Sequence, residues 1–109
     1  MKFSESLKKN EEFKKVYEKG KSLANRHLII YVLRNELKKN RVGISVSKKV
    51  GNSVVRHRVT RLIRECYRIS EEDFKCGYDI VIIARTTAKE LSFKEIKSAL
   101  LHLKKLHDI

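Results

Sequence analysis

The sequence predicts an α+β fold: a two-layer α/β sandwich in which helices cover a four-stranded mixed sheet, in the element order αβββαβα. Two hydrophobic patterns support this class, because β-branched or alternating segments are interleaved with segments whose apolar residues recur every three to four positions. The chain has 109 residues, 41% of them hydrophobic, which is enough for a hydrophobic core that needs no disulfide or metal ion to stabilise it. Since the sequence contains no repeat or linker, we expect a single domain over residues 1–109.

The first predicted helix begins near Asn10, a residue suited to capping, and ends at Gly20. Phe13, Val16 and Tyr17 follow the i, i+3, i+4 spacing of one helix face. This spacing leaves open whether the two aromatic rings belong to the core or to a binding surface.

Four strands are expected from the extended segments. Residues 22–34 are interrupted by an Asn-Arg pair and are predicted to form two strands, the second apolar on both faces. Residues 35–40 are polar and predicted to form a hairpin loop. Residues 41–47 alternate, with small Gly and Ser residues on one face that would let a ligand approach closely. Residues 78–84 are apolar on both faces, which is typical of a central strand.

A basic helix is predicted from about Ser53, with Asn52 as its N-cap. Residues 48–68 contain seven Lys or Arg against a single acid, Glu65. At about 100° per residue, apolar and basic side chains separate onto opposite faces. The apolar stripe consists of Val55, Val59, Leu62, Cys66 and Ile69. The basic side chains are His57, Arg61, Arg64 and Arg68, with Arg56 and Arg58 on the flanks and Lys48 and Lys49 before the helix.

The last predicted helix follows a loop at residues 85–91 and opens with a capping box, Ser92 and Glu95. Its expected core stripe is Phe93, Ile96, Leu100 and Leu103. The acids at residues 71–73 are predicted to lie in a solvated turn.

The formal net charge of +13 and the isoelectric point near 10 imply a polyanionic partner, either nucleic acid or an acidic membrane surface. The longest apolar run, residues 28–33, is too short to span a bilayer, and the N-terminus lacks a hydrophobic signal segment. We therefore expect a cytoplasmic protein.

Nucleic-acid binding is the favoured interpretation of the basic helix. A charge run is usually a solvated face, but here the charges are nearly unopposed, share one stripe and flank a capped helix start. Insertion into a DNA groove stays open, although no helix-turn-helix pair precedes this helix. Aromatic rings on a sheet, such as Tyr31, stack single-stranded bases in many proteins; plain core packing is the alternative.

Motifs of protein catalysis are missing: the sequence contains no GxSxG, HExxH or Walker loop. The chain has four histidines, His27, His57, His102 and His107. They do not share a helix face at ligand spacing, and the last two are expected to be solvated. The two cysteines, Cys66 and Cys76, are expected to be free and structural. We therefore assign no catalytic residue and no metal site to the polypeptide.

Residues 46–64 (VSKKVGNSVVRHRVTRLIR) closely resemble the signature of the bacterial ribonuclease P protein subunit. The resemblance extends to residues 10–17, 24–26, 41–46 and 78–85, so it covers nearly the whole chain in order. It implies the protein cofactor of a ribozyme that removes the 5′ leader from precursor tRNA. In that enzyme the RNA subunit carries out magnesium-dependent hydrolysis, so magnesium is expected mainly on the RNA.

The resemblance also implies partners and sites. The expected partners are the RNA subunit and precursor tRNA with its single-stranded leader, and neither a membrane nor a small-molecule substrate is expected. The implied RNA-binding residues are Lys48, Lys49, Asn52, Arg56, His57, Arg58, Arg61, Arg64 and Arg68. The implied leader cleft is lined by Phe13, Tyr17 and Tyr31. The implied fold is a ribosomal-protein-like domain with a left-handed crossover between the third and fourth strands.

Two residues within the motif differ from the family's usual pattern. His57 stands where Asn is usual, and Thr60 stands where Lys is usual. His57 can still donate to a phosphate, whereas Thr60 removes a cation and is left out of the site. The alternative function is a structural RNA-binding protein of ribosomal type with no role in cleavage.

Overall fold

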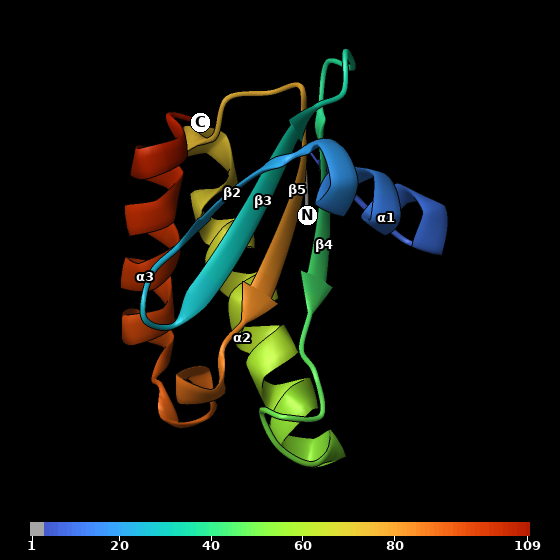
Figure 1. Cartoon of the computed structure of the whole chain (residues 1–109). Helices are drawn as coiled ribbons and strands as arrows, with labels where there is room; N and C mark the ends of the chain where they lie inside the picture. Colours follow the sequence, from blue (N-terminus) through green and yellow to red (C-terminus); the bar gives the residue numbers. More distant parts are fainter. Residues whose placement is uncertain (1–3) are drawn as a thin grey trace.

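The computed structural model describes residues 4–109. Its centre is a five-stranded mixed sheet with the strand order β1-β4-β5-β3-β2 (Figure 1). The strands are β1 (Ser4–Ser6), β2 (Lys21–Ala24), β3 (Leu28–Arg34), β4 (Asn40–Ser45) and β5 (Tyr78–Ala84). The helices are α1 (Asn10–Lys19), α2 (Ser53–Ser70) and α3 (Phe93–His107), with short 3₁₀ helices at Glu71–Asp73 and Thr86–Glu90.

Helices cover both faces of the sheet, but unequally. α2 and α3 pack on one face over a core of twenty buried residues that includes Ile30 of β3 and Ile82 of β5. α1 covers part of the opposite face, where Leu7, Val16 and Val81 are buried. β3 and β5 therefore have side chains packed on both faces, in line with the apolar residues on both faces of these segments. None of the helices in residues 4–109 has the length and apolar character needed to cross a membrane.

The α+β class is confirmed, but the sheet has five strands instead of the predicted four. The additional strand, β1, is three residues long and pairs in parallel with β4, where Ser4 lies opposite Asn40. A segment this short and polar carries no period-two signal. It is held by a contact distant in sequence, a hydrogen bond of 2.7 Å between Ser4 Oγ and Tyr67 Oη of α2.

The prediction of a hairpin loop at residues 35–40 is wrong. β5 lies between β3 and β4, antiparallel to the first and parallel to the second, so the segment crosses the end of β5. Asn40 belongs to β4 and is 3% exposed. Its Oδ1 accepts from the backbone N–H of Tyr78 at 2.9 Å, and its Nδ2 donates to the carbonyl of Lys75 at 2.9 Å. A buried amide therefore organises this end of the sheet.

β4, α2 and β5 form the expected strand–helix–strand crossover. In Figure 1 both strands run downward, β5 lies to the left of β4, and α2 passes behind the sheet. This arrangement makes the connection left-handed. General handedness statistics favour the opposite hand, whereas the family resemblance implied the one observed.

Several element boundaries differ by one or two residues from the prediction. Lys9, not Asn10, occupies the N-cap position of α1, and Glu12 Oε1 accepts from the Lys9 N–H at 3.0 Å. Gly20 ends α1 as expected. β4 ends at Ser45, two residues early. The capping box of α3 is present, and the segment before it contains a 3₁₀ helix where a plain loop was predicted.

The buried stripe of α2 is rotated relative to the predicted one. Val59 and Cys66 are buried as expected, but Ile69 is 48% exposed, so its assignment to the core was wrong. Ile63 and Tyr67, both fully buried, take the core positions instead. The helix has two neighbouring apolar stripes, and the angle at which it packs on the sheet determines which of the two is buried.

Two side chains that were expected to be solvated are not. Glu71 is 5% exposed. His107 is partly buried against β3, where its Nε2 lies 2.8 Å from the carbonyl oxygen of Ile30. Burial lowers the pKa of His107, so the neutral ring donates this hydrogen bond. Cys66 is buried and Cys76 exposed, and both are free as predicted.

Candidate nucleic-acid interface

The N-terminal end of α2 is arranged for an anion. Asn52 Oδ1 accepts from the backbone N–H of Val55 at 3.0 Å, which confirms the predicted N-cap. The first turn of α2 contains no acid, whereas the first turns of α1 and α3 contain Glu. Lys48 and Lys49 are exposed just before the helix. The positive end of the helix dipole is therefore uncompensated and flanked by two cations.

The basic face of α2 consists of His57, Arg61, Arg64 and Arg68, all exposed. These residues recur every three or four positions on the side opposite buried Val59. An open groove of about 400 Å³ lies beside this face. Its lining residues are Val46, Arg56, His57, Thr60, Arg61 and Arg64. The structure thus brings four of the implied RNA-binding residues to one groove.

Arg56 lines this groove and has a buried donor without a protein partner. Its side chain is partly buried, and its Nε is buried with no hydrogen-bond partner among residues 4–109. A buried donor left unpaired costs about 1–3 kcal/mol. A phosphate in the groove would remove that cost only if the side chain turned outward, where the guanidinium would offer parallel N–H groups that match an oxyanion. Thr60 donates its hydroxyl to the Arg56 carbonyl at 2.8 Å, within the helix.

Two of the implied arginines already have protein partners. Arg58 donates to the carbonyls of Lys89 and Leu91 at 3.0 and 2.9 Å, so it ties α2 to the segment before α3. Arg68 donates to the carboxylate of Glu65 at 2.9 Å in an exposed pair. Exposed pairs of this kind contribute little stability, so Arg68 can exchange Glu65 for a phosphate at little cost. Arg58 is better suited to holding the helix in place.

Phe13, Tyr17 and Tyr31 come together on the sheet face beside α1, and we call these three rings the aromatic wall. The Tyr17 and Tyr31 rings meet edge to face at a centroid distance of 5.1 Å, and Phe13 lies 6.4 Å from Tyr17. Tyr17 is 39% exposed, and the other two rings are partly buried. The rings are therefore neither fully buried core residues nor isolated surface residues. Tyr17 contacts both of the other rings.

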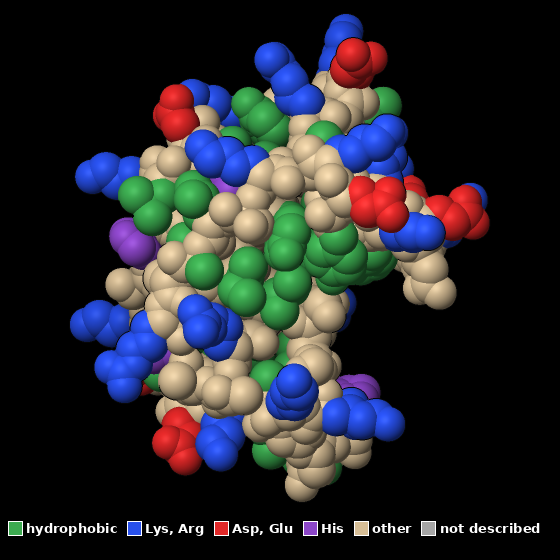
Figure 2. Space-filling model, viewed as in Figure 1, with side chains coloured by type: hydrophobic (Ala, Val, Ile, Leu, Met, Phe, Trp, Pro, Cys, Tyr) green, Lys and Arg blue, Asp and Glu red, His purple; other side chains and the backbone are tan. Residues whose placement is uncertain are grey.

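The aromatic wall borders an apolar strip formed by Ile29 and Ile83, which pair across β3 and β5 and are partly exposed. Ile83 in turn lies beside Ser45, whereas Val81, the partner of Tyr31, is fully buried on the α1 side. Figure 2 shows hydrophobic side chains gathered at the centre of this face and extending beneath the charged side chains of α1, with Lys and Arg around the margin. An apolar floor with an aromatic edge and a cationic margin suits unstacked bases joined by phosphates.

Within the described residues, no three His, Cys, Asp or Glu side chains gather to hold a metal ion. Burial raises the pKa of the Cys66 thiol to about 11, so Cys66 is protonated at neutral pH and is a poor nucleophile.

Three residues that organise this surface were not predicted. Arg41, Glu12 and Asp79 link α1 to the sheet through ion pairs. The sequence did contain a signal, because Asp79 interrupts the apolar run at residues 78–84, and a lone acid in a buried strand is rarely left unpaired.

The fold and this surface define the class: a small basic α+β domain with a cationic helix beside an aromatic sheet face. The chain belongs to the ribonuclease P protein family, since the family model described as Ribonuclease P matches residues 1–107. The ribonuclease P protein component of Lachnoclostridium phytofermentans is 59% identical over 106 residues, which cover 97% of this chain and 91% of that protein. The corresponding protein of Alkaliphilus metalliredigens is 57% identical over 103 residues, covering 94% and 93%.

Solved structures agree with this assignment. The RNase P protein of Staphylococcus aureus matches with a TM-score of 0.87 and 40% identity, covering 94% of each chain. The RNase P protein of Thermotoga maritima matches with a TM-score of 0.86 and 30% identity, covering 93% of this chain and 96% of that one. Family membership gives the chain a role in tRNA processing together with an RNA subunit. The ribosomal-type alternative is therefore not supported.

Proposed function

We propose that this protein is the RNA-binding cofactor of the ribonuclease P ribozyme, which removes the 5′ leader of precursor tRNA by magnesium-dependent endonucleolytic hydrolysis. In this proposal the RNA subunit carries out the hydrolysis. The protein stabilises the catalytic RNA and binds the single-stranded leader. Its partners are the RNA subunit and precursor tRNA, and it works in the cytoplasm.

The observation that carries this proposal is that the two surfaces meet around the end of β4. Ser45, the last residue of β4, lies beside Ile83 on the sheet face that carries the aromatic wall. The next residue, Val46, packs against the core on the opposite face and lines the groove beside the basic face. A single strand lying on the strip would stack its bases on the aromatic wall. Folded RNA next to it would place its phosphates on α2, where arginine side chains favour oxyanions.

We propose the following division of roles on the RNA-binding surface. Arg56, Arg61 and Arg64 bind phosphates in the groove, and Arg68 joins them after leaving Glu65. His57 donates a hydrogen bond, Asn52 caps the helix so that its remaining N–H groups face the RNA, and Arg58 holds α2 against its neighbour. Lys48 and Lys49 extend the cationic surface past the helix start. The aromatic wall of Phe13, Tyr17 and Tyr31 receives the leader.

Magnesium is proposed to reside mainly on the RNA subunit, where it would stabilise the charge that develops at the reacting phosphate. The proposal places no metal site on the polypeptide, whose buried carboxylate Asp79 is already paired with Arg41 and Asn35. The proposed contribution of the protein is binding and orientation of RNA.

The test is 5′ cleavage of precursor tRNA at low magnesium by the RNA subunit alone, by the protein alone, and by both together. We expect efficient cleavage only from the mixture. Cleavage by the protein alone would refute the assignment of hydrolysis to the RNA. An RNA activity that does not change when the protein is added would refute the cofactor function.

A further inference from the structure

α1 has a small apolar footprint on the sheet. On its side Leu7, Val16 and Val81 are buried, compared with twenty residues on the opposite side. Val16 is the single buried residue of α1 itself. Because hydrophobic stabilisation scales with buried area, apolar packing fixes the orientation of α1 only weakly. A directional contact is needed to set it.

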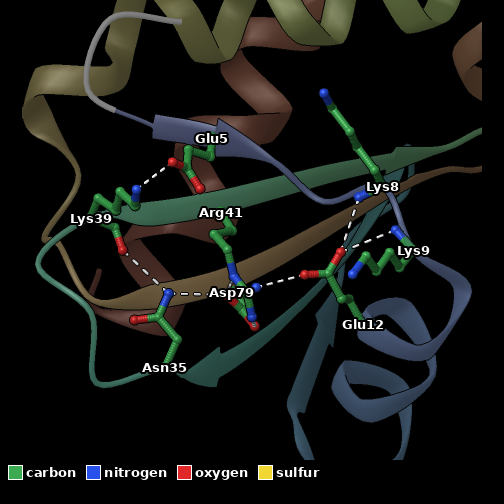
Figure 3. A network of polar contacts seen from close by, with 8 residues as sticks. All are labelled: Glu5, Lys8, Lys9, Glu12, Asn35, Lys39, Arg41 and Asp79. Carbon is green, nitrogen blue, oxygen red and sulfur yellow. Dashed lines mark hydrogen bonds and ion pairs between the residues drawn. The ribbon is translucent and has the colours of Figure 1, made fainter.

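Arg41 of β4 supplies that contact (Figure 3). Its Nη1 donates to Glu12 Oε2 of α1 at 2.6 Å. Its Nε and Nη2 donate to the two carboxylate oxygens of Asp79 at 2.8 and 2.6 Å. Arg41 and Asp79 are register partners on neighbouring strands. One guanidinium thus connects two strands with the first turn of α1, and we call this triad the Arg41 bridge.

Asp79 is the fixed end of the bridge. It is 2% exposed and also accepts from Asn35 Nδ2 at 2.9 Å. Burial by itself would raise the pKa of Asp79, but the hydrogen bonds from Arg41 and Asn35 outweigh burial and lower it. The carboxylate and the guanidinium are therefore both charged at neutral pH, and the two parallel hydrogen bonds hold the guanidinium plane in one orientation.

Glu12 is the helix end of the bridge, and it lies next to the aromatic wall. Its Oε1 accepts from the Lys9 N–H at the start of α1 while Oε2 accepts from Arg41. The next residue, Phe13, packs its ring over Gly43, where an added Cβ would lie 2.5 Å from ring atoms. Gly43 is two residues along β4 from Arg41, on the same face of the sheet. One strand therefore fixes both the helix backbone and the first ring.

We propose that Arg41, oriented by Asp79, is a positioning residue for the aromatic wall. Acting through Glu12, it sets the angle and spacing at which the rings of α1 face Tyr31. This role presupposes the proposed binding of the leader. A wall that is held in place before the leader arrives loses less conformational entropy on binding, so the bridge raises leader affinity without touching RNA.

The test breaks the bridge at its helix end, because Glu12→Ala leaves the Arg41–Asp79 pair intact in the sheet. Glu11→Ala is the matched control, since it removes the same charge from the exposed neighbouring residue. In the holoenzyme, Glu12→Ala should weaken binding of a precursor tRNA with a long leader by about five- to tenfold, as expected for partial loss of stacking on one base. Affinity for a precursor with a truncated leader, and affinity of the protein for the RNA subunit, should not change.

Two further variants separate positioning from folding. Glu12→Gln keeps one of the two acceptor oxygens and should fall between wild type and Glu12→Ala. Gly43→Ala displaces the Phe13 ring without touching the bridge and should also reduce long-leader affinity. In the protein without RNA, NMR contacts between the Tyr17 and Tyr31 rings should weaken in Glu12→Ala and persist in Glu11→Ala.

An equal loss of affinity for long and truncated leaders, or an unchanged contact between the rings, would overturn the positioning role. Tyr31→Ala separates this role from the proposed function. If Tyr31→Ala lowers long-leader affinity and Glu12→Ala does not, leader binding stands and the positioning role is wrong. If neither variant lowers it, the leader site itself is wrong.

Discussion

Tyr31 is the residue through which the proposed leader site can be tested most directly, since its backbone lies in a central strand and its ring faces the apolar strip. Tyr31→Ala should weaken binding and cleavage of a long-leader precursor by the roughly 1–3 kcal/mol that a stacked base contributes. Binding of mature tRNA, which lacks the leader, should not change. Tyr31→Phe keeps the ring and serves as the control. Equal effects on both RNAs would contradict the assignment.

Asn52 combines a structural role with a proposed binding role, and substitutions can separate the two. Asn52→Ala removes the cap on the Val55 N–H and should lower the free energy of unfolding by about 1 kcal/mol. Asn52→Asp keeps the cap and favours the helix dipole, so stability should be retained. The new charge should nevertheless weaken affinity for the RNA subunit, because it faces phosphates. Urea unfolding and RNA titration measure the two effects, and unchanged RNA affinity in Asn52→Asp would exclude phosphate near this residue.

At the residue scale, sequence patterns predicted contacts between residues close in sequence and missed contacts between residues far apart in sequence. The cap at Asn52 and the exposure of Arg61 and Arg64 follow from neighbours within one helical turn. The two partners of Arg41 lie 38 and 29 residues away, and the carbonyl partners of Arg58 lie 31 and 33 residues away. No spacing rule connects such residues, so their roles could be assigned only from the fold.

At the scale of elements, the contact between α3 and β3 gives the protein a pH dependence. Burial lowers the pKa of His107 from its ordinary 6.5, and Lys21 nearby acts in the same direction. The folded protein therefore binds fewer protons than the unfolded chain in this window, so stability is fully present above about pH 6.5 and is lost as the pH falls below it. The slope should stay below the limit of about 1.4 kcal/mol per pH unit for one proton, because the ring is partly exposed.

Thermal unfolding between pH 7.5 and 5, a range chosen to bracket the reference value, measures this slope. His107→Gln keeps a donor for the Ile30 carbonyl but cannot titrate, so its stability should vary less with pH. A slope that is identical in the wild type and in His107→Gln would assign the pH dependence to other groups.

The elements themselves show where sequence patterns suffice and where they fail. α3 was predicted with its cap and core stripe because one face is apolar and the other charged. In α2, Ile63 and Tyr67 compete with Leu62 and Ile69 for the buried side, and the sequence offers two neighbouring stripes. Tertiary packing chose the stripe that faces the sheet. The basic face of α2, on the opposite side, was predicted correctly because the basic side chains of this helix are concentrated there.

At the scale of the whole molecule, the list of strands could largely be predicted but their order could not. β5 inserts between β3 and β4, although residues 46–77, which include α2, separate it from β4, and β3 lies still further back in the sequence. Register and order depend on which apolar faces meet, and residues 78–84 are apolar on both faces, so their pattern fits any central position. The left-handed crossover was predicted from the resemblance to a known family. General handedness statistics would have predicted a right-handed one.

The charge distribution of the whole molecule leads to the last prediction. If the net charge of +13 alone attracts RNA, any two cations should matter equally. If the groove and the basic face bind phosphates, Arg61→Ala with Arg64→Ala should lower affinity for the RNA subunit and reduce the slope of log affinity against log salt by about 0.7–0.9 per lost phosphate contact. Lys38→Ala with Lys105→Ala removes the same charge from exposed positions elsewhere and should leave the slope nearly unchanged. The salt slope separates the two cases because counterion release counts only the cations that neutralise phosphates. Equal slopes for the two double variants would therefore mean that net charge, and not the surface of α2, determines RNA binding.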